Sequence, residues 1–594
     1  MGQKESVAAR EALVDVQDFE EKYFQETYTS YSKASMRRVD PLIDSVHSPY
    51  DPNGYRAILT LIPGVIRLLT ILAAPYFFLL ACFVLLTYIF FQVSVYVVLA
   101  AVHESSVLIV VIVALLFYGS ALLIYFYYPG QSPIREGEQG ENPFGAYLRP
   151  GLYHSTKSAT INNIINDCPL LTSPEARRAA LPIFDEKGRQ TDTLEPTPWI
   201  FTGDMRTIFP FLAFSPPKAA YIRRWVRVPL ADGPLCDMVH TDAISKYEAV
   251  ALDWLPPKDT APNKEKSKEM AVLLLAGLTG GSEEGYILDL VNTIHKRGWH
   301  AFVMLGRGLG GTPCASDAFF HGARTVDLQA TAKVVRTCLP AETKICVAGI
   351  SMGGIIVVNA FAKGHLNGLA DCGLSIAGTF DTHRNRYFKH SRDVWQPVLS
   401  QGLKEAFAAQ PGCMRRMSSR LGPKARITLD EIANVSDFDL KVIKPLNRFR
   451  NQEHYYVDMS PPINEYKNFK TPFLTLHAAE DPILHVDSIP VEMAQKGEIT
   501  PNFIALITET GGHVGWPIGW APWRYRWHFQ NSIVMEFCES IVKHCVSAAA
   551  GIEKNEAKER LLDGVKDMDR EKERSGSNIT QRRQPQPSSA TTRA

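Results

Sequence analysis

Two uncharged stretches near the N-terminus constrain the fold of this chain more than any other feature. No charged residue occurs from Leu68 to Val102 or from Val107 to Tyr128, and only His103-Glu104-Ser105-Ser106 separates the two stretches. The hydrocarbon core of a bilayer is about 30 Å thick, and roughly 20 apolar helical residues span it. Helices of a soluble core rarely stay apolar on every face for so long. The two stretches therefore predict an N-terminal transmembrane helical hairpin.

Flanking charges predict how this hairpin is oriented. Positive residues tend to stay on the cytoplasmic side of a membrane, and the connecting loop contains neither Lys nor Arg. Both termini, and everything after Tyr128, are therefore expected to face the cytosol from the endoplasmic reticulum or another endomembrane. Pro63, Gly64 and Pro75 leave a single re-entrant hairpin as the alternative. The arginines that flank the stretches are Arg37, Arg38, Arg56, Arg67 and Arg135.

The first residues of the chain match a lipidation pattern. Gly2 occupies the acceptor position for N-myristoylation, and Ser6 stands in the favoured place. A cytosolic transferase would have to reach Gly2, which agrees with the predicted orientation. The pattern is short, so a chance match is the alternative.

Charge and cysteine content exclude several other classes of protein. The chain has 63 Lys+Arg and 62 Asp+Glu, a formal net charge of +1, so it lacks the basic footprint of a nucleic-acid-binding protein. Ten Cys among 594 residues are too few for a disulfide scaffold, and no C-x-x-C pair indicates structural zinc. Reduced thiols on the cytosolic side are expected.

Beyond the membrane segment, the pattern of apolar and polar residues changes at Ala249. Short apolar runs then alternate with helix-length amphipathic stretches, which predicts βαβ units and a mostly parallel sheet. The alternation lapses at about 380–466, a basic, loop-rich insertion expected to cap the site. The expected segments are a polar lead (1–55), the membrane segment (56–130), an N-terminal extension (131–248), the α/β domain (249–550) and a charged, disordered tail (551–594).

A G-x-S-x-G motif, Gly349 to Gly353, supplies a candidate nucleophile. The motif follows the apolar run Ile345–Ala348 and opens into a helical run, Gly354 to Lys363. This strand–turn–helix context exposes the Oγ of a serine on a strained turn, where flanking glycines avoid a Cβ clash. Ser351 is therefore predicted to be a nucleophile. A glycine-rich structural turn is the alternative.

A base and an orienting acid follow Ser351 in the order Ser, Asp, His. Asp481 comes directly after the apolar run Pro472–Leu476, and His513 lies in a small-residue loop after another such run. His513 is predicted to take the proton of Ser351 and later protonate the leaving alcohol, while Asp481 selects the histidine tautomer. Glu480 and Asp487 are rival acids.

Two backbone amides are predicted to form the oxyanion hole. One should come from Met352, which follows the nucleophile, and the other from Leu278 in the glycine-rich segment after an early strand. A phosphate-binding loop is the rival interpretation of that segment, but no Gly-Lys-Ser/Thr follows it.

A second glycine motif matches the sequence pattern of a dinucleotide-binding site. Gly306, Gly308 and Gly311 spell G-x-G-x-x-G, and Asp327 lies downstream. In a dinucleotide site the last glycine opens a helix directly, whereas here the next helix is expected only near Thr325. No nucleotide is predicted, and neither a cofactor nor a metal, since H-E-x-x-H is also absent.

These residues resemble a known family. The segment 277–282, the run from Arg307 to Pro313 and the motif at 349–353 are together similar to the YheT and embryogenesis-associated EMB8 group of α/β-hydrolases, the ABHD type. Pro198-Trp199, Gly203 to Thr207, Leu252-Asp253-Trp254, Phe438-Asp439, Tyr455-Tyr456 and Ser460 extend the resemblance, which covers roughly 199–546. Asp204 stands where the family usually has His. The resemblance implies an α/β-hydrolase fold and a membrane-anchored lipase or esterase.

The predicted serine triad and the predicted membrane anchoring together predict the enzymatic activity. A serine triad performs acyl transfer through an acyl-enzyme, and a membrane-bound enzyme is expected to act on a lipid ester. The resemblance implies acylglycerols, phospholipids or medium-chain acyl esters. An alcohol O-acyltransferase and a catalytically inactive membrane scaffold are the alternatives. Five aromatic residues after His513 are consistent with either a membrane-interface belt or core packing: Trp516, Trp520, Trp523, Tyr525 and Trp527.

Overall fold

The computed structural model describes residues 13–14, 150–184, 190–229, 247–258, 265–312, 314, 318–410, 413, 429–545 and 547. Gly2, the membrane segment predicted at 56–130 and the tail predicted from 551 lie outside the described residues. Among the helices that are described, none combines the length and the apolar character needed to cross a bilayer.

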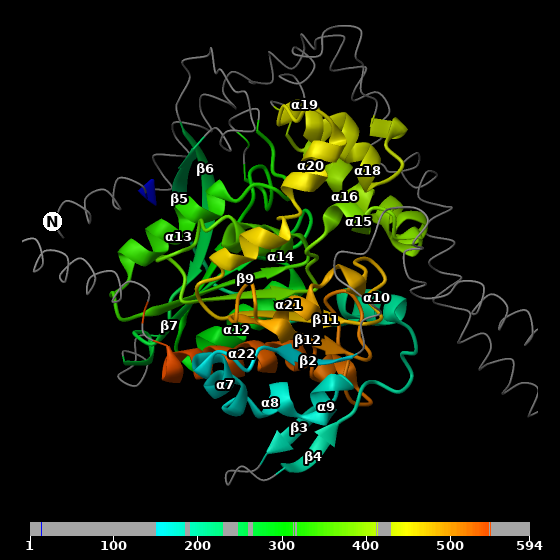
Figure 1. Ribbon diagram of the computed structural model, residues 1–594. Coiled ribbons are helices and arrows are strands. Elements are labelled where there is room, and N and C mark those ends of the chain that lie inside the picture. Colours follow the sequence, from blue (N-terminus) through cyan, green and yellow to red (C-terminus); the bar gives the residue numbers. More distant parts are fainter. Residues whose placement is uncertain are drawn as a thin grey trace, which may run out of the picture.

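A ten-stranded sheet organises the described residues (Figure 1). The strands follow the spatial order β1-β5-β6-β8-β7-β9-β10-β11-β12-β2. From β8 to β12 neighbouring strands run parallel, whereas β6 is antiparallel to both β5 and β8, and β2 and β1 add antiparallel edges. The strands are β1 (Leu13–Val14), β2 (Gly151–His154), β5 (Ile222–Pro229), β6 (Tyr247–Leu255), β7 (Met270–Leu275), β8 (His300–Met304), β9 (Lys344–Ile350), β10 (Cys372–Ile376), β11 (Phe473–Ala478) and β12 (Phe503–Thr508).

Helices cover both faces of the sheet, which explains why every residue of β7, β10, β11 and β12 is buried. One face packs against α7 (Ala159–Asn166), α8 (Pro169–Thr172), α12 (Gly285–Arg297) and α22 (His528–His544). The other face packs against α13 (Val326–Cys338), α14 (Met352–Ala362) and α21 (Val491–Lys496). This mostly parallel sheet, with a sharp strand-to-helix turn between β9 and α14, is the α/β-hydrolase fold.

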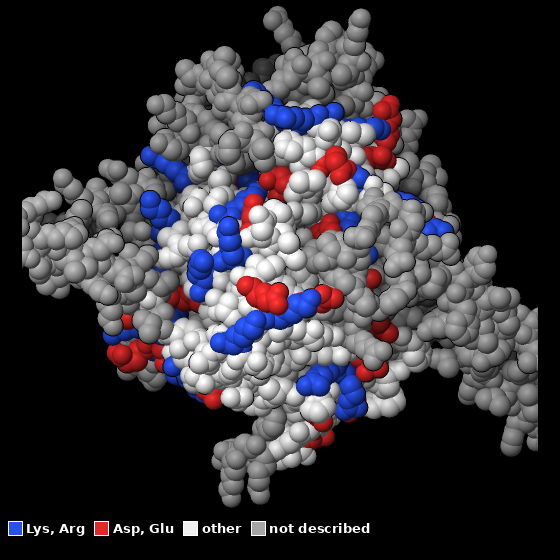
Figure 2. All heavy atoms as spheres, viewed as in Figure 1, with Lys and Arg blue, Asp and Glu red and all other residues white. Residues whose placement is uncertain are grey.

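Residues upstream of 249 also belong to this architecture. The region 131–248, expected as an extension, contributes β2, β5 and the start of β6 to the sheet. It also supplies α9 (Pro174–Arg177), a separate hairpin of β3 (Leu181–Phe184) and β4 (Gln190–Leu194), and helix α10 (Gly203–Ala213). Charged residues of both signs are intermingled on the face drawn in Figure 2, in keeping with the near-zero net charge.

The insertion between β10 and β11, called the cap from here on, is mostly helical in its described residues (377–410, 413 and 429–472), not loop-rich as expected. Its helices bury an aromatic core of their own, including Phe407, Phe438 and Tyr455. The apolar residues of this core do not recur at a regular helical period in the sequence, because two π-helices interrupt that period. The cap elements are α15 (Thr382–Asn385), η3 (Ser391–Trp395), α16 (Gln396–Ala408), η4 (Leu429–Glu431), α18 (Val435–Phe438), η5 (Asp439–Ile443), α19 (Lys444–Leu446), α20 (Gln452–Asp458) and η6 (Ile463–Asn468).

Asp439 makes the stability of this cap depend on pH. Burial raises the pKa of its carboxyl to about 7, although the hydroxyl of Tyr456 donates a hydrogen bond of 2.8 Å to it. Because the folded-state pKa exceeds the unfolded one, the stabilising contribution is complete at acidic pH and is lost as pH rises towards 7. The thermal midpoint of the wild type should therefore fall relative to that of Asp439→Asn between pH 5 and pH 8. Parallel curves for the two proteins would contradict this assignment.

Candidate active site

Ser351 occupies the turn between β9 and α14. Its φ of 55° and ψ of −120° are unusual for a residue with a side chain, and such a conformation costs on the order of 1–3 kcal/mol. The surrounding fold holds it in place, because the Ser351 N–H donates to the carbonyl of Ile376 on β10 at 2.9 Å. The turn is therefore the strained strand-to-helix geometry that the motif predicted.

Two glycines permit this turn. A Cβ on Gly349 would lie 2.1 Å from the carbonyl oxygen of Gly353, and a Cβ on Gly353 would lie 2.4 Å from the carbonyl oxygen of Leu275. Both contacts are with backbone, which cannot move aside without disturbing the sheet. The glycines are required because β9, the turn and β7 approach one another closely.

The structure brings Ser351, His513 and Asp481 into one hydrogen-bonded chain. His513 Nε2 lies 2.7 Å from Ser351 Oγ, and His513 Nδ1 lies 2.8 Å from Asp481 Oδ2. The three residues follow β9, β12 and β11 at the carboxyl edge of the sheet. Asp481 is fully buried and His513 is 6% exposed. The arrangement can move a proton from the hydroxyl to the imidazole while the carboxylate orients the ring.

Asp481 stays ionised although it is buried. Burial by itself raises its pKa, but the charge and the hydrogen bond of His513, together with His477 and the Leu484 N–H, lower the pKa below its usual value. Asp481 Oδ1 accepts the N–H groups of Ile483 at 2.8 Å and Leu484 at 2.9 Å. The other oxygen remains directed at His513.

The rival acids are engaged elsewhere. Glu480 forms an ion pair with Arg206, and burial raises the pKa of Glu480. Asp487 lies 3.7 Å from the imidazole of His485. Of the three candidate acids, Asp481 is thus the one in hydrogen-bond contact with His513.

Helix α10 contacts the two loops that carry His513 and Asp481, a role that the sequence did not predict. Thr207 Oγ1 accepts the N–H of His513 at 2.7 Å and donates to the carbonyl of Gly203 at 2.7 Å. Arg206 binds Glu480, the neighbour of Asp481. The segment from Gly203 to Thr207 stood out in the sequence only through the family resemblance, because its partners lie about 300 residues downstream.

Asp204, where the family usually has His, links α10 to the cap. Its Oδ1 accepts the indole N–H of Trp395 at 2.6 Å and lies 2.8 Å from His390 Nε2. The departure from the family pattern is therefore accommodated by two polar partners from the cap.

The loop after β7 packs against Ser351, the candidate nucleophile. A Cβ on Gly277 would lie 3.1 Å from Ser351 Cβ. The Gly277 N–H already donates to Tyr286 Oη at 2.9 Å, so the next amide, that of Leu278, is the better candidate for the oxyanion hole. Met352 begins α14, and the N–H groups of a first helical turn lack intrahelical acceptors. The assignment of both amides stays a prediction.

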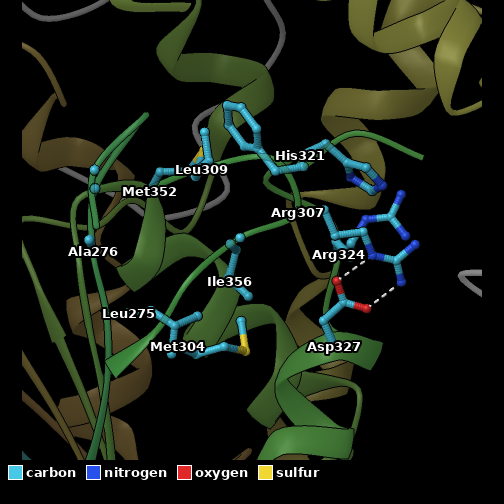
Figure 3. A pocket seen from close by; sticks show the side chains of 14 residues that line it. Leu275, Ala276, Met304, Arg307, Leu309, His321, Arg324, Asp327, Met352 and Ile356 are labelled. Atoms are coloured by element: carbon cyan, nitrogen blue, oxygen red, sulfur yellow. Dashed lines mark hydrogen bonds and ion pairs between the residues drawn. The ribbon is translucent and has the colours of Figure 1, made fainter. Parts of the chain in front are cut away.

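A cavity of about 30 Å³ adjoins this loop, with room for only a few water molecules (Figure 3). Arg307 and Asp327 line it and form a buried, bidentate ion pair with N–O distances of 2.8 and 2.5 Å. Asp327, which lies where a dinucleotide site would have its ribose-binding acid, is therefore bound to Arg307, and α13 begins only at Val326, well after Gly311. Other lining residues are Gly277, Met304, Leu309, Met352 and Ile356.

Comparison with known proteins agrees with the fold. No family model matches the chain. Phospholipase ABHD3 of Mus musculus is 26% identical over 362 residues, 60% of this chain and 80% of that protein. The monoacylglycerol lipase of Saccharomyces cerevisiae is 28% identical over 268 residues, 44% of this chain and 58% of that protein. Embryogenesis-associated protein EMB8 of Picea glauca is 29% identical over 311 residues, 50% of this chain and 64% of that protein.

A solved structure, the acylaminoacyl peptidase of Pyrococcus horikoshii, aligns with 54% of this chain and 42% of its own, at 18% identity and a TM-score of 0.31. The described residues have the α/β-hydrolase fold, as the sheet topology above shows. The relatives make the chain a homologue of the ABHD-type α/β-hydrolases, the group that the motifs resemble.

Replacing the orienting acid tests the hydrogen-bonded chain. Asp481→Asn should keep the fold but present the wrong histidine tautomer, which lowers kcat on the order of 10⁴-fold in a serine triad. The rate of hydrolysis of a soluble p-nitrophenyl ester measures this effect. Asp487→Asn, a neighbouring acid without contact to His513, is the matched control and should stay within about threefold of the wild type. A larger loss in the control would reassign the acid.

Proposed function

We propose that this protein is a membrane-anchored serine hydrolase that cleaves carboxylic esters of lipids. The observation that carries the proposal is the chain of two hydrogen bonds, 2.7 and 2.8 Å long, that joins Ser351, His513 and Asp481. The names of the relatives, a phospholipase and a monoacylglycerol lipase, support a lipid ester as substrate. Acylglycerols, phospholipids and medium-chain acyl esters are the proposed classes.

In the first half-reaction, Ser351 Oγ attacks the ester carbonyl while His513 Nε2 takes the hydroxyl proton. The amides of Leu278 and Met352 bind the negative oxygen of the tetrahedral intermediate. The intermediate collapses, the bond to the alcohol oxygen breaks, and His513 returns the proton to the leaving alcohol. Throughout, Asp481 stabilises the imidazolium.

In the second half-reaction, water replaces the alcohol. His513 takes a proton from water as the water oxygen attacks the acyl carbonyl, and the same two amides bind the second oxyanion. The bond to Ser351 Oγ breaks, the serine regains its proton from His513, and a carboxylic acid leaves. An alcohol in place of water would yield a new ester by the same steps.

The proposed anchoring rests on the sequence. The uncharged stretches within 56–130 are proposed to hold the hydrolase on the cytosolic face of an endomembrane, with Gly2 as a candidate myristoylation site. The lead (1–55), extension (131–248), α/β domain (249–550) and tail (551–594) are kept as the proposed division of the chain. Such anchoring places the enzyme where lipid esters are concentrated.

Lipid hydrolysis can be measured with the full chain reconstituted in phosphatidylcholine vesicles that contain acylglycerol. The wild type should release fatty acid, and Ser351→Ala should reduce kcat by several orders of magnitude because the nucleophile is lost. Equal thermal midpoints for the two proteins would show that the fold is intact. Equal fatty-acid release from both would contradict the proposal, and ester synthesis on addition of ethanol would favour the acyltransferase alternative.

The proposed topology predicts that the C-terminal tail is accessible from the cytosol. Protease added to sealed endomembrane vesicles should remove an epitope placed after residue 594, without detergent. A lumenal marker protein serves as the control and should resist digestion until detergent is added. Protection of the epitope in sealed vesicles would overturn the cytosolic assignment.

A further inference from the structure

Five large apolar side chains are exposed where helix α10 and the loop after His513 meet. Phe201 is 43% exposed, Phe211 48%, Leu212 77%, Trp520 77% and Trp523 50%. We call these five residues the α10 patch. Apolar area left in water is unfavourable, and a cluster of such residues marks a contact surface more often than a scattered few do.

Trp199 and Phe209 connect part of the patch through ring contacts. The indole of Trp199 lies 6.3 Å from that of Trp523 and 5.1 Å from the ring of Phe209. Trp199 Nε1 also donates to the carbonyl of Trp520 at 3.0 Å. Phe209 and Leu212 are three residues apart on α10, so they are neighbours on the surface of that helix. The aromatic cluster therefore connects the exposed tryptophans to the end of α10.

The structure also distinguishes buried from exposed residues among the aromatic residues after His513, for which the sequence allowed either a membrane-interface belt or core packing. Trp516 and Trp527 are each 2% exposed and belong to the hydrophobic core. Trp520 and Trp523, from the same segment, project into solvent. Core packing thus accounts for the first pair but not for the second.

We propose that the α10 patch sits in the interfacial layer of a lipid bilayer, an inference that rests on the proposed function and names the surface that brings the site to its substrate. Tryptophan prefers the headgroup level of a membrane. Arg524, next to Trp523 in the chain, is exposed, so a cation accompanies the apolar residues. Cations near a bilayer surface are attracted to anionic headgroups.

The tether predicted upstream keeps the patch within reach of a bilayer. Residues 129–150 connect the second uncharged stretch to β2. At about 3.3–3.6 Å per residue, such a segment extends at most about 80 Å. The described domain therefore cannot leave the neighbourhood of a membrane that holds the uncharged stretches.

The patch and the chemistry share one helix. The N-terminal half of α10 carries Thr207, which holds the His513 N–H, and Arg206, which binds Glu480. The C-terminal end of the same helix carries Phe211 and Leu212. Docking through the patch therefore places the bilayer beside the element that braces the triad, without requiring the site itself to enter the lipid.

A kinetic comparison separates docking from chemistry. The full chain in phosphatidylcholine vesicles is tested on a bilayer-resident lipid ester and on soluble p-nitrophenyl acetate. Leu212→Asp should lower kcat/KM for the lipid ester at least tenfold and change that for the soluble ester less than twofold. Val457→Asp is the matched control, since Val457 is 52% exposed on α20 of the cap, apart from α10 in Figure 1, and it should alter neither rate.

Other results of this comparison would overturn the proposal. An unchanged lipid-ester rate for Leu212→Asp shows that the patch does not dock on the bilayer, and an equal loss on both esters shows a structural role only. A wild type inactive on both esters counts against the proposed function alone, and the cross-linking measurement that follows then decides whether the patch docks on lipid.

Photo-cross-linking tests docking independently of activity. A benzophenone-bearing residue in place of Leu212, in the full chain in the same vesicles, should form an adduct with the mass of phosphatidylcholine. The same group in place of Val457 should not. A cross-link from position 212 to another segment of the chain or to a second copy would show that protein, not lipid, covers the patch, and the proposal would fail.

Discussion

The hydrogen bond between Asp481 and His513, 2.8 Å long and buried from solvent, is the interaction on which the rest of the site depends. Burying a carboxylate away from solvent costs free energy unless a positive charge and hydrogen-bond donors compensate for the lost solvation. Here the imidazole and the N–H groups of Ile483 and Leu484 do so, and the pKa of Asp481 is lowered despite burial. Because β11 and β12 are adjacent and parallel, the loops that follow them meet at the sheet edge, and the acid and the base come into contact there.

Strain at Ser351 is tolerated because the surrounding elements are closely packed. The positive φ of Ser351 persists between a fully buried β10 and a helix that packs against the sheet. Gly349 and Gly353 leave room for backbone atoms alone. Helix α10 adds a second support from outside the sheet, since Thr207 and Arg206 fix the loops that carry His513 and Asp481. The triad is therefore positioned from two directions.

The sequence predicted the parts of this site that local pattern encodes. Ser351, Asp481 and His513 each follow a short apolar run, and strand ends of a parallel sheet converge. The contact of α10 with the His513 loop was not predicted, because Thr207 and His513 are 306 residues apart and no local sequence pattern pairs them. The cap was expected to be loop-rich because its two π-helices break the 3.6-residue period. The tryptophans after His513 could not be divided into core and surface, since neighbours distant in sequence decide which of them are covered.

The proposed function depends above all on Ser351 being the activated nucleophile. The most direct test treats membranes that contain the wild-type protein with a fluorophosphonate and locates the adduct by peptide mass spectrometry. We expect one phosphonylated residue, Ser351, and much slower labelling when His513 is replaced by Ala, because the imidazole removes the hydroxyl proton. An adduct on a different serine, or an unmodified Ser351 in folded wild-type protein, would contradict this expectation.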